Sequence, residues 1–91
     1  MASSNRSIYV KPIPMDVNEE EIKVFFQRFG DVTAVTFPPR NKVHPDLLAK
    51  YKRYVFVEFE NPRSAQEALQ TNGRCYWGNK LEINPAIHTN L

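Results

Sequence analysis

The sequence predicts an α+β fold in which a four-stranded antiparallel sheet carries two helices on one face. Three observations support this fold: alternating apolar residues that mark strands, apolar residues at helical spacing that mark helices, and the order β-α-β-β-α-β along the chain. With 91 residues, the chain has room for one hydrophobic core. The two helices would cover one face of the sheet and leave the other open.

The first strand is predicted at 8–11, where Ile8 and Val10 alternate with Tyr9 and Lys11, and where Pro12 ends the run. The first helix follows. Asn18 and Glu21 form a capping-box pattern at its start, and Gly30 ends it. One apolar stripe at helical spacing consists of Ile22, Phe25, Phe26 and Phe29.

A second strand is predicted at 32–37, and a long basic connection follows over 38–53. Its charged residues are Arg40, Lys42, Asp46, Lys50, Lys52 and Arg53, whereas the acidic side chains gather at Asp16 and 19–21. The charge is therefore segregated, although the whole chain carries only +2. Residues 45–51 could form a short helix with Pro45 near its first position. A solvated, flexible hairpin loop remains the alternative.

The central strand, 52–59, has the sequence Lys52-Arg53-Tyr54-Val55-Phe56-Val57-Glu58-Phe59. Alternation directs its valines and Phe59 to one face, and Tyr54 and Phe56 to the other. Exposed rings beside basic residues suit the stacking of nucleic-acid bases near bound phosphates. By pattern alone, a strand buried on both faces is an equal alternative.

The second helix is predicted from Asn61 as cap and Pro62 as first residue, and Gly73 ends it. A compact aromatic loop, 74–78, leads to the last strand at 80–84, where Leu81 and Ile83 face inward. The complete order predicts a ferredoxin-like split β-α-β arrangement. No element then remains to cover Tyr54 and Phe56, which favours the open-face interpretation.

The sequence offers little support for other classes of function. Cys75 is the single cysteine, and His44 and His88 lie far apart, so no metal-ligand spacing is present. There is no glycine-rich phosphate loop and no long apolar run. We therefore expect no enzyme activity, no cofactor or metal, and no membrane association.

At this point the residues resemble the RNA recognition motif family. The family's longer signature starts with a basic residue and carries aromatic residues at its third, fifth and eighth positions. The run 52–59 matches these features but has Arg53 and Val55 where the family has small residues. The shorter signature is similar to Ile8-Tyr9-Val10-Lys11-Pro12-Ile13.

The resemblance implies specific roles. Tyr9 and Phe56 would each stack a base, Tyr54 would lie against sugars, and Lys52 would contact phosphate. Arg53 would either add a phosphate contact or hinder close approach. The full predicted RNA-binding set is Tyr9, Lys11, Arg40, Lys42, Lys50, Lys52, Arg53, Tyr54, Phe56, Lys80, Glu82 and Asn84.

Two further interpretations rest on finer resemblances. Glu21-Ile22 with Phe25-Phe26, and the run from Lys80 to Ile87, look like the DAZ-like subgroup of germline translational regulators. Arg74-Cys75-Tyr76 with the acidic first helix is similar to peptide-binding variants of the family. In that alternative, the peptide-binding residues are Glu19, Glu20, Arg74 and Tyr76.

These resemblances imply a monomeric domain at 7–87, between a flexible tail at 1–6 and a tail at 88–91. They also imply single-stranded RNA as the partner, with a protein as a possible second partner, in a nuclear or cytoplasmic, intracellular setting. We expect a larger post-transcriptional regulator to contain this domain.

Overall fold

The structure is a computed structural model that describes residues 5–86. Ile87, the tail predicted at 88–91 and most of the tail predicted at 1–6 lie outside the described residues.

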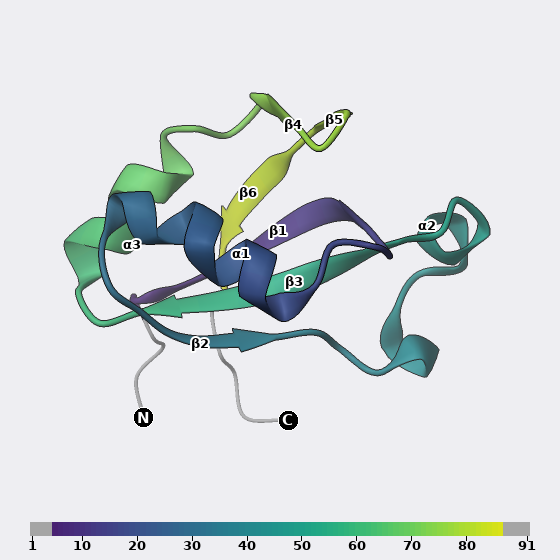
Figure 1. The fold of residues 1–91 in the computed structure, drawn as a ribbon, viewed down its shortest axis with the longest axis horizontal. Helices are drawn as coiled ribbons and strands as arrows, with labels where there is room; N and C mark the ends of the chain where they lie inside the picture. Colours follow the sequence, from purple (N-terminus) through teal and green to yellow (C-terminus); the bar gives the residue numbers. More distant parts are fainter. Residues whose placement is uncertain (1–4, 87–91) are drawn as a thin grey trace.

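Within residues 5–86, the chain forms a four-stranded antiparallel sheet with the strand order β2-β3-β1-β6 (Figure 1). Its strands are β1 (Ser7–Pro14), β2 (Val32–Thr36), β3 (Lys52–Phe59) and β6 (Glu82–Pro85). The helices α1 (Glu19–Phe26) and α3 (Pro62–Leu69) pack on one face of this sheet (Figure 1). The predicted fold class is confirmed.

The helix ends follow from their capping residues. Asn18 Oδ1 accepts a hydrogen bond from the Glu21 amide at 2.8 Å, and Glu21 Oε1 accepts one from the Asn18 amide at 3.0 Å. This capping box satisfies two amides that the first turn leaves without helical partners. At α3, Asn61 accepts from the amide of Arg63, and Pro62 occupies the first turn. A 3₁₀ turn, η1 (Gln27–Phe29), extends α1 as far as Gly30.

The core lies between the sheet and the two helices. The inward residues of β3, Val55, Val57 and Phe59, are fully buried, as are Ile8 and Val10 of β1. On α1, Ile22 and Phe26 are buried against them. Alternation along the strands therefore separates a buried face from a face that the two helices leave open.

Two strands differ from the prediction by more than one residue. β1 continues past Pro12 to Pro14, because a bulge between Val10 and Ile13 absorbs one residue. The predicted strand at 80–84 is divided. Asn79–Lys80 is β5, which pairs with β4 (Cys75–Tyr76) as a hairpin, and β6 pairs with β1 only from Glu82 onward.

The physical reason for this division lies in the backbone of Leu81. Its carbonyl accepts from the Gly73 amide at 2.8 Å, and its amide donates to the Arg74 carbonyl at 2.9 Å. Leu81 is thus paired with the end of the α3 connection. On the neighbouring strand, the next residue is Pro12, which has no amide to donate.

Candidate nucleic-acid interface

Three aromatic side chains lie together on the open face of the sheet. Tyr9 on β1 is paired across the strands with Phe56 on β3, and their ring centroids are 6.3 Å apart. Tyr54 lies 5.4 Å from Phe56 and 6.3 Å from Tyr9, both at steep interplanar angles. Because the rings meet edge to face or tilted, they do not stack on one another. We call Tyr9, Tyr54 and Phe56 the aromatic platform.

Polar residues of β6 extend the platform. Asn84 is the cross-strand partner of Tyr9, and Glu82 is the partner of Lys11. Since directly opposed residues share a face of the sheet, all four belong to the open face. The structure therefore brings together six of the predicted binding residues: Tyr9, Lys11, Tyr54, Phe56, Glu82 and Asn84.

The connection between β2 and β3 is folded. It contains a 3₁₀ turn, η2 (Arg40–Lys42), and a short helix, α2 (Pro45–Ala49), with Pro45 in its first turn. His44 caps this helix, since its Nδ1 accepts from the Asp46 amide at 3.1 Å. The short helix considered from the sequence is thus present.

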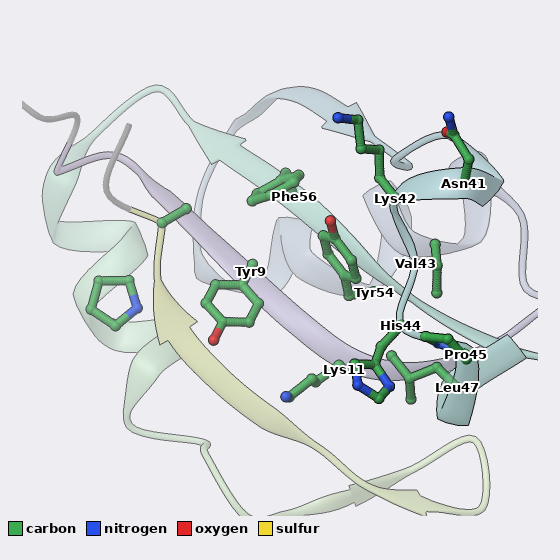
Figure 2. A pocket seen from close by; sticks show the side chains of 12 residues that line it. Tyr9, Lys11, Asn41, Lys42, Val43, His44, Pro45, Leu47, Tyr54 and Phe56 are labelled. Atoms are coloured by element: carbon green, nitrogen blue, oxygen red, sulfur yellow. The ribbon is translucent and has the colours of Figure 1, made fainter. Parts of the chain in front are cut away.

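This connection lies beside the aromatic platform and borders a groove of about 750 Å³ (Figure 2). The residues around the groove are Tyr9, Lys11, Asn41, Lys42, Val43, His44, Pro45, Leu47, Tyr54, Phe56, Pro85 and Ala86. Val43 is only 5% exposed. We call residues 41–47 the wall. Its presence corrects the expectation that no part of the chain approaches Tyr54 and Phe56.

Sequence reasoning missed the members of the wall. A signal was present, however, because Val43, Leu47 and Leu48 are apolar residues within a basic segment. Of the predicted basic residues in this segment, Lys42 borders the groove, whereas Arg40 and Lys50 are exposed elsewhere on it.

Two predicted basic residues are engaged elsewhere. Lys52 Nζ donates to Asn79 Oδ1 on β5, which holds the start of β3 against the hairpin. Lys80 pairs with Cys75 in that hairpin, so it is not on the open face where we expected it.

Arg53 requires a larger correction. Its guanidinium group donates through Nη2 to the carbonyl of Val17 at 2.9 Å and, more weakly, to that of Met15 at 3.4 Å. Its Cζ lies 3.6 Å from the centroid of the Phe37 ring. Arg53 therefore points to the helix side of the sheet, away from the groove. Partial burial lowers the pKa of its guanidinium group from the ordinary value.

A second hollow lies on the helix side, bordered by Glu20, Glu21, Val24, Phe25, Arg28 and Trp77. Phe25 packs edge-on against Tyr76 at 4.5 Å, and the Arg28 guanidinium lies 4.1 Å from the Phe25 centroid. Of the four residues predicted to bind peptide, Glu20 borders this hollow. Tyr76 contacts Phe25 but does not border the hollow, and Glu19 and Arg74 are exposed and also lie outside its border.

Comparison with known proteins settles the family. The family model described as "RNA recognition motif" matches residues 8–82. This chain belongs to the RNA recognition motif family. The domain is typical of RNA-binding proteins, and the family is not an enzyme family.

Relatives of this RNA recognition motif include polyadenylate-binding protein 3 of Arabidopsis thaliana, which is 32% identical over 88% of the chain and 34% of its own length. The human protein boule-like is 36% identical over 88% of the chain and 26% of its own length. The latter similarity agrees with the resemblance to the DAZ-like subgroup. The chain spans about a third or less of the length of these relatives.

Among solved structures, the RNA recognition motif of Rna15 with bound RNA (GU) superposes with a TM-score of 0.72 at 22% identity. The match covers 94% of this chain and 87% of that chain. At this level of identity, the similarity concerns the fold.

The two departures from the family signature both face the helix side of the motif. Val55 replaces a small residue and is fully buried in the core. Arg53 replaces glycine and is bonded to the β1–α1 connection. Neither side chain borders the groove, so the platform is unobstructed by them.

Other functional features are absent from the described part of the domain. Residues 5–86 contain no group of three or more His, Cys, Asp or Glu side chains arranged to hold a metal ion. Over the same range, no helix combines the length and apolar character needed to cross a membrane.

Proposed function

We propose that this domain binds single-stranded RNA on the open face of its sheet, with bases stacked on Tyr9 and Phe56 and a sugar against Tyr54. The observation that carries the proposal is the contact of three rings on adjacent strands, on the face that α1 and α3 leave uncovered. Base–aromatic stacking contributes about 1–3 kcal/mol per base. Three rings would thus supply much of the ~8 kcal/mol that micromolar affinity requires.

The groove beside the platform provides a path for the strand. Lys11 and Lys42 border it and offer cations for phosphate oxygens, while Val43 and Leu47 offer an apolar surface for a base or sugar. Arg40 and Lys50 are exposed further along the same segment and would add long-range attraction. We leave Arg53 and Lys80 out of the interface because they point elsewhere, and we give Lys52 a supporting role.

A carboxylate on the open face would repel phosphates unless it is balanced. Glu58 accepts a hydrogen bond from Thr33 Oγ1 at 3.0 Å, and its second oxygen lies 3.7 Å from Arg6. Glu82 lies opposite Lys11. These pairings reduce the repulsion and leave carboxylate oxygens able to accept from base amino groups. They favour a defined base path over indiscriminate binding of polyanions.

The platform is tested by replacing each ring. Tyr9→Ala, Tyr54→Ala and Phe56→Ala should each weaken binding of a randomised single-stranded RNA pool by about 1–3 kcal/mol. Fluorescence anisotropy titrations would measure this, and circular dichroism would verify that each variant is folded. The matched control is Tyr51→Asn, which removes an exposed ring outside the groove and tolerates the positive φ of 57° at that position. Unchanged affinity in all three platform variants would sink the stacking proposal.

The relatives support an assignment to RNA metabolism, since they include polyadenylate-binding protein 3 and, at 33% identity, the serine/arginine-rich splicing factor SR34B of Arabidopsis thaliana. We propose a role in mRNA processing or translation, in the nucleus or cytoplasm, for a monomeric, non-enzymatic domain at 7–87 within a larger regulator.

A second candidate function is peptide binding at the helix-side hollow. It is favoured by the exposure of Val24, at 59%, between the acidic first turn of α1 and the ring of Trp77. A peptide with basic and aromatic residues would suit this surface. Titrating an isotope-labelled domain with such a peptide should shift the Val24 methyl signals and the Trp77 indole signal, and Val24→Glu should abolish the Trp77 shift. The two functions use different faces and are compatible.

A further inference from the structure

Residues 38–51 form a long excursion from the sheet. A residue just before the excursion and a residue just after it are in contact. Phe37 directly precedes the excursion, and Arg53 follows it at the second position of β3. The Arg53 guanidinium stacks on the Phe37 ring with Cζ 3.6 Å from the centroid. This cation–π contact therefore closes the stem of the excursion.

The stem is also attached to a third segment, the connection between β1 and α1. Arg53 Nη2 donates to the carbonyls of Val17 and Met15, at 2.9 Å and 3.4 Å. The Met15 amide in turn donates to the carbonyl of Tyr51, the last residue of the excursion, at 2.9 Å. Stacking and hydrogen bonding at once require a planar, forked cation, which lysine does not provide.

The wall occupies the opposite side of the sheet from this contact. Its residues Val43 and Leu47 border the groove together with Tyr54, which is next to Arg53 in β3. Arg53 itself does not border the groove. The wall is joined to the stem through the rest of the excursion, so a contact that closes the stem limits where the wall can lie relative to the platform.

We propose that Arg53 is a positioning residue for the RNA site: by clamping Phe37 to the β1–α1 connection, it holds the wall beside the platform from the far side of the sheet. This inference rests on the proposed function. It also gives a reason for arginine at a place where the family signature has glycine.

The test uses the whole 91-residue chain and a randomised single-stranded RNA pool. Arg53→Met and Arg53→Lys should each weaken binding by roughly three- to tenfold, in keeping with the loss of a partly buried cation–π contact. Arg28→Met is the matched control. It removes the same charge and a similar stack, on Phe25 instead of Phe37, and it should leave affinity unchanged.

If Arg53 had a purely structural role, its replacement would lower stability without acting through the wall. A double-mutant cycle that combines Arg53→Met with Leu47→Ser distinguishes this role from positioning of the wall. If Arg53 acts through the wall, Arg53→Met should reduce RNA affinity only slightly when Leu47→Ser is already present. Full additivity, or unchanged affinity of folded Arg53→Met, would overturn the proposal. If Arg53→Met does not fold, Phe37→Leu keeps the apolar packing, removes the stack and is judged by the same criteria.

A readout without RNA keeps this inference separate from the proposed function. Arg53→Met should shift the Val43 and Leu47 methyl signals and accelerate hydrogen exchange at the Met15 amide, whereas Arg28→Met should do neither. If the unmodified domain fails to bind RNA, the proposed function falls, and these signals alone decide whether the clamp exists. Unmoved methyl signals would refute it.

Discussion

Gly30 ends the first helical segment with φ at +146° and ψ at −178°, a backbone conformation essentially restricted to glycine. Space is short as well, since a Cβ built on Gly30 would lie 2.0 Å from Ser64 Oγ on α3. The residue therefore allows both a sharp exit from η1 and close approach of α3. Gly78, in the β4–β5 hairpin, also has positive φ, but its surroundings are open.

These differences predict unequal costs for the same substitution. Gly30→Ala should destabilise the domain by about 3 kcal/mol or more, because backbone strain and a steric clash combine. Gly78→Ala should cost only about 1–2 kcal/mol from the left-handed backbone alone. Urea denaturation of both variants measures the difference, and equal midpoints would contradict the role of Ser64.

At the scale of the element, the β2–β3 excursion combines order with exposed charge. Its wall residue Val43 is buried and its short helix is capped by His44, while Arg40, Lys42 and Lys50 are exposed. A folded excursion holds its cations at defined places instead of averaging them over many conformations. Phosphate contacts from this segment should therefore be few and countable.

Salt dependence counts those contacts. Lys42→Gln should flatten the plot of log affinity against log salt by about 0.7, the value for one contact to a single strand. Lys23→Gln, on the helix face, is the control for a general loss of charge and should change the slope much less. If the slope for Lys42→Gln equals that of the unmodified domain, Lys42 does not contact phosphate.

At the scale of the whole molecule, the sheet separates the hydrophobic core from the proposed RNA site. Helices α1 and α3 and the inward residues form the core on one side, and the platform and wall form the proposed RNA site on the other. Small domains have little stability to spare, commonly ~5–15 kcal/mol. The core must therefore supply nearly all the stability, because the open face contributes little burial.

Truncation in the core tests this division. Phe59 is fully buried and in edge contact with Phe26. Phe59→Ala should therefore lower the free energy of unfolding by about 3–5 kcal/mol. Val24→Ala, at an exposed position of α1, should change the free energy of unfolding by no more than about 0.5 kcal/mol. Thermal or urea unfolding would measure both, and a small effect at Phe59 would place the core elsewhere.

How far the sequence predicts this architecture depends on the range of the interactions. Alternation in β3 and the caps at Asn18 and Asn61 are local, so the elements and the platform followed from them. The course of the wall depends on Arg53 meeting Phe37 and Met15, contacts that no local pattern encodes. The split at Leu81 likewise depends on backbone pairing with Gly73, which is set by tertiary packing.

β3 also constrains how this chain can change in length. Its residues alternate strictly between core and platform, with Val55 and Val57 on one side and Tyr54 and Phe56 on the other. Deleting or inserting a single residue within the strand would exchange the two sides, placing rings in the core and valines at the groove. The excursion at 38–51, by contrast, can absorb added residues at its exposed tip at small entropic cost. Insertions should therefore accumulate in the excursion, while the strand beside it varies only in the identity of its residues.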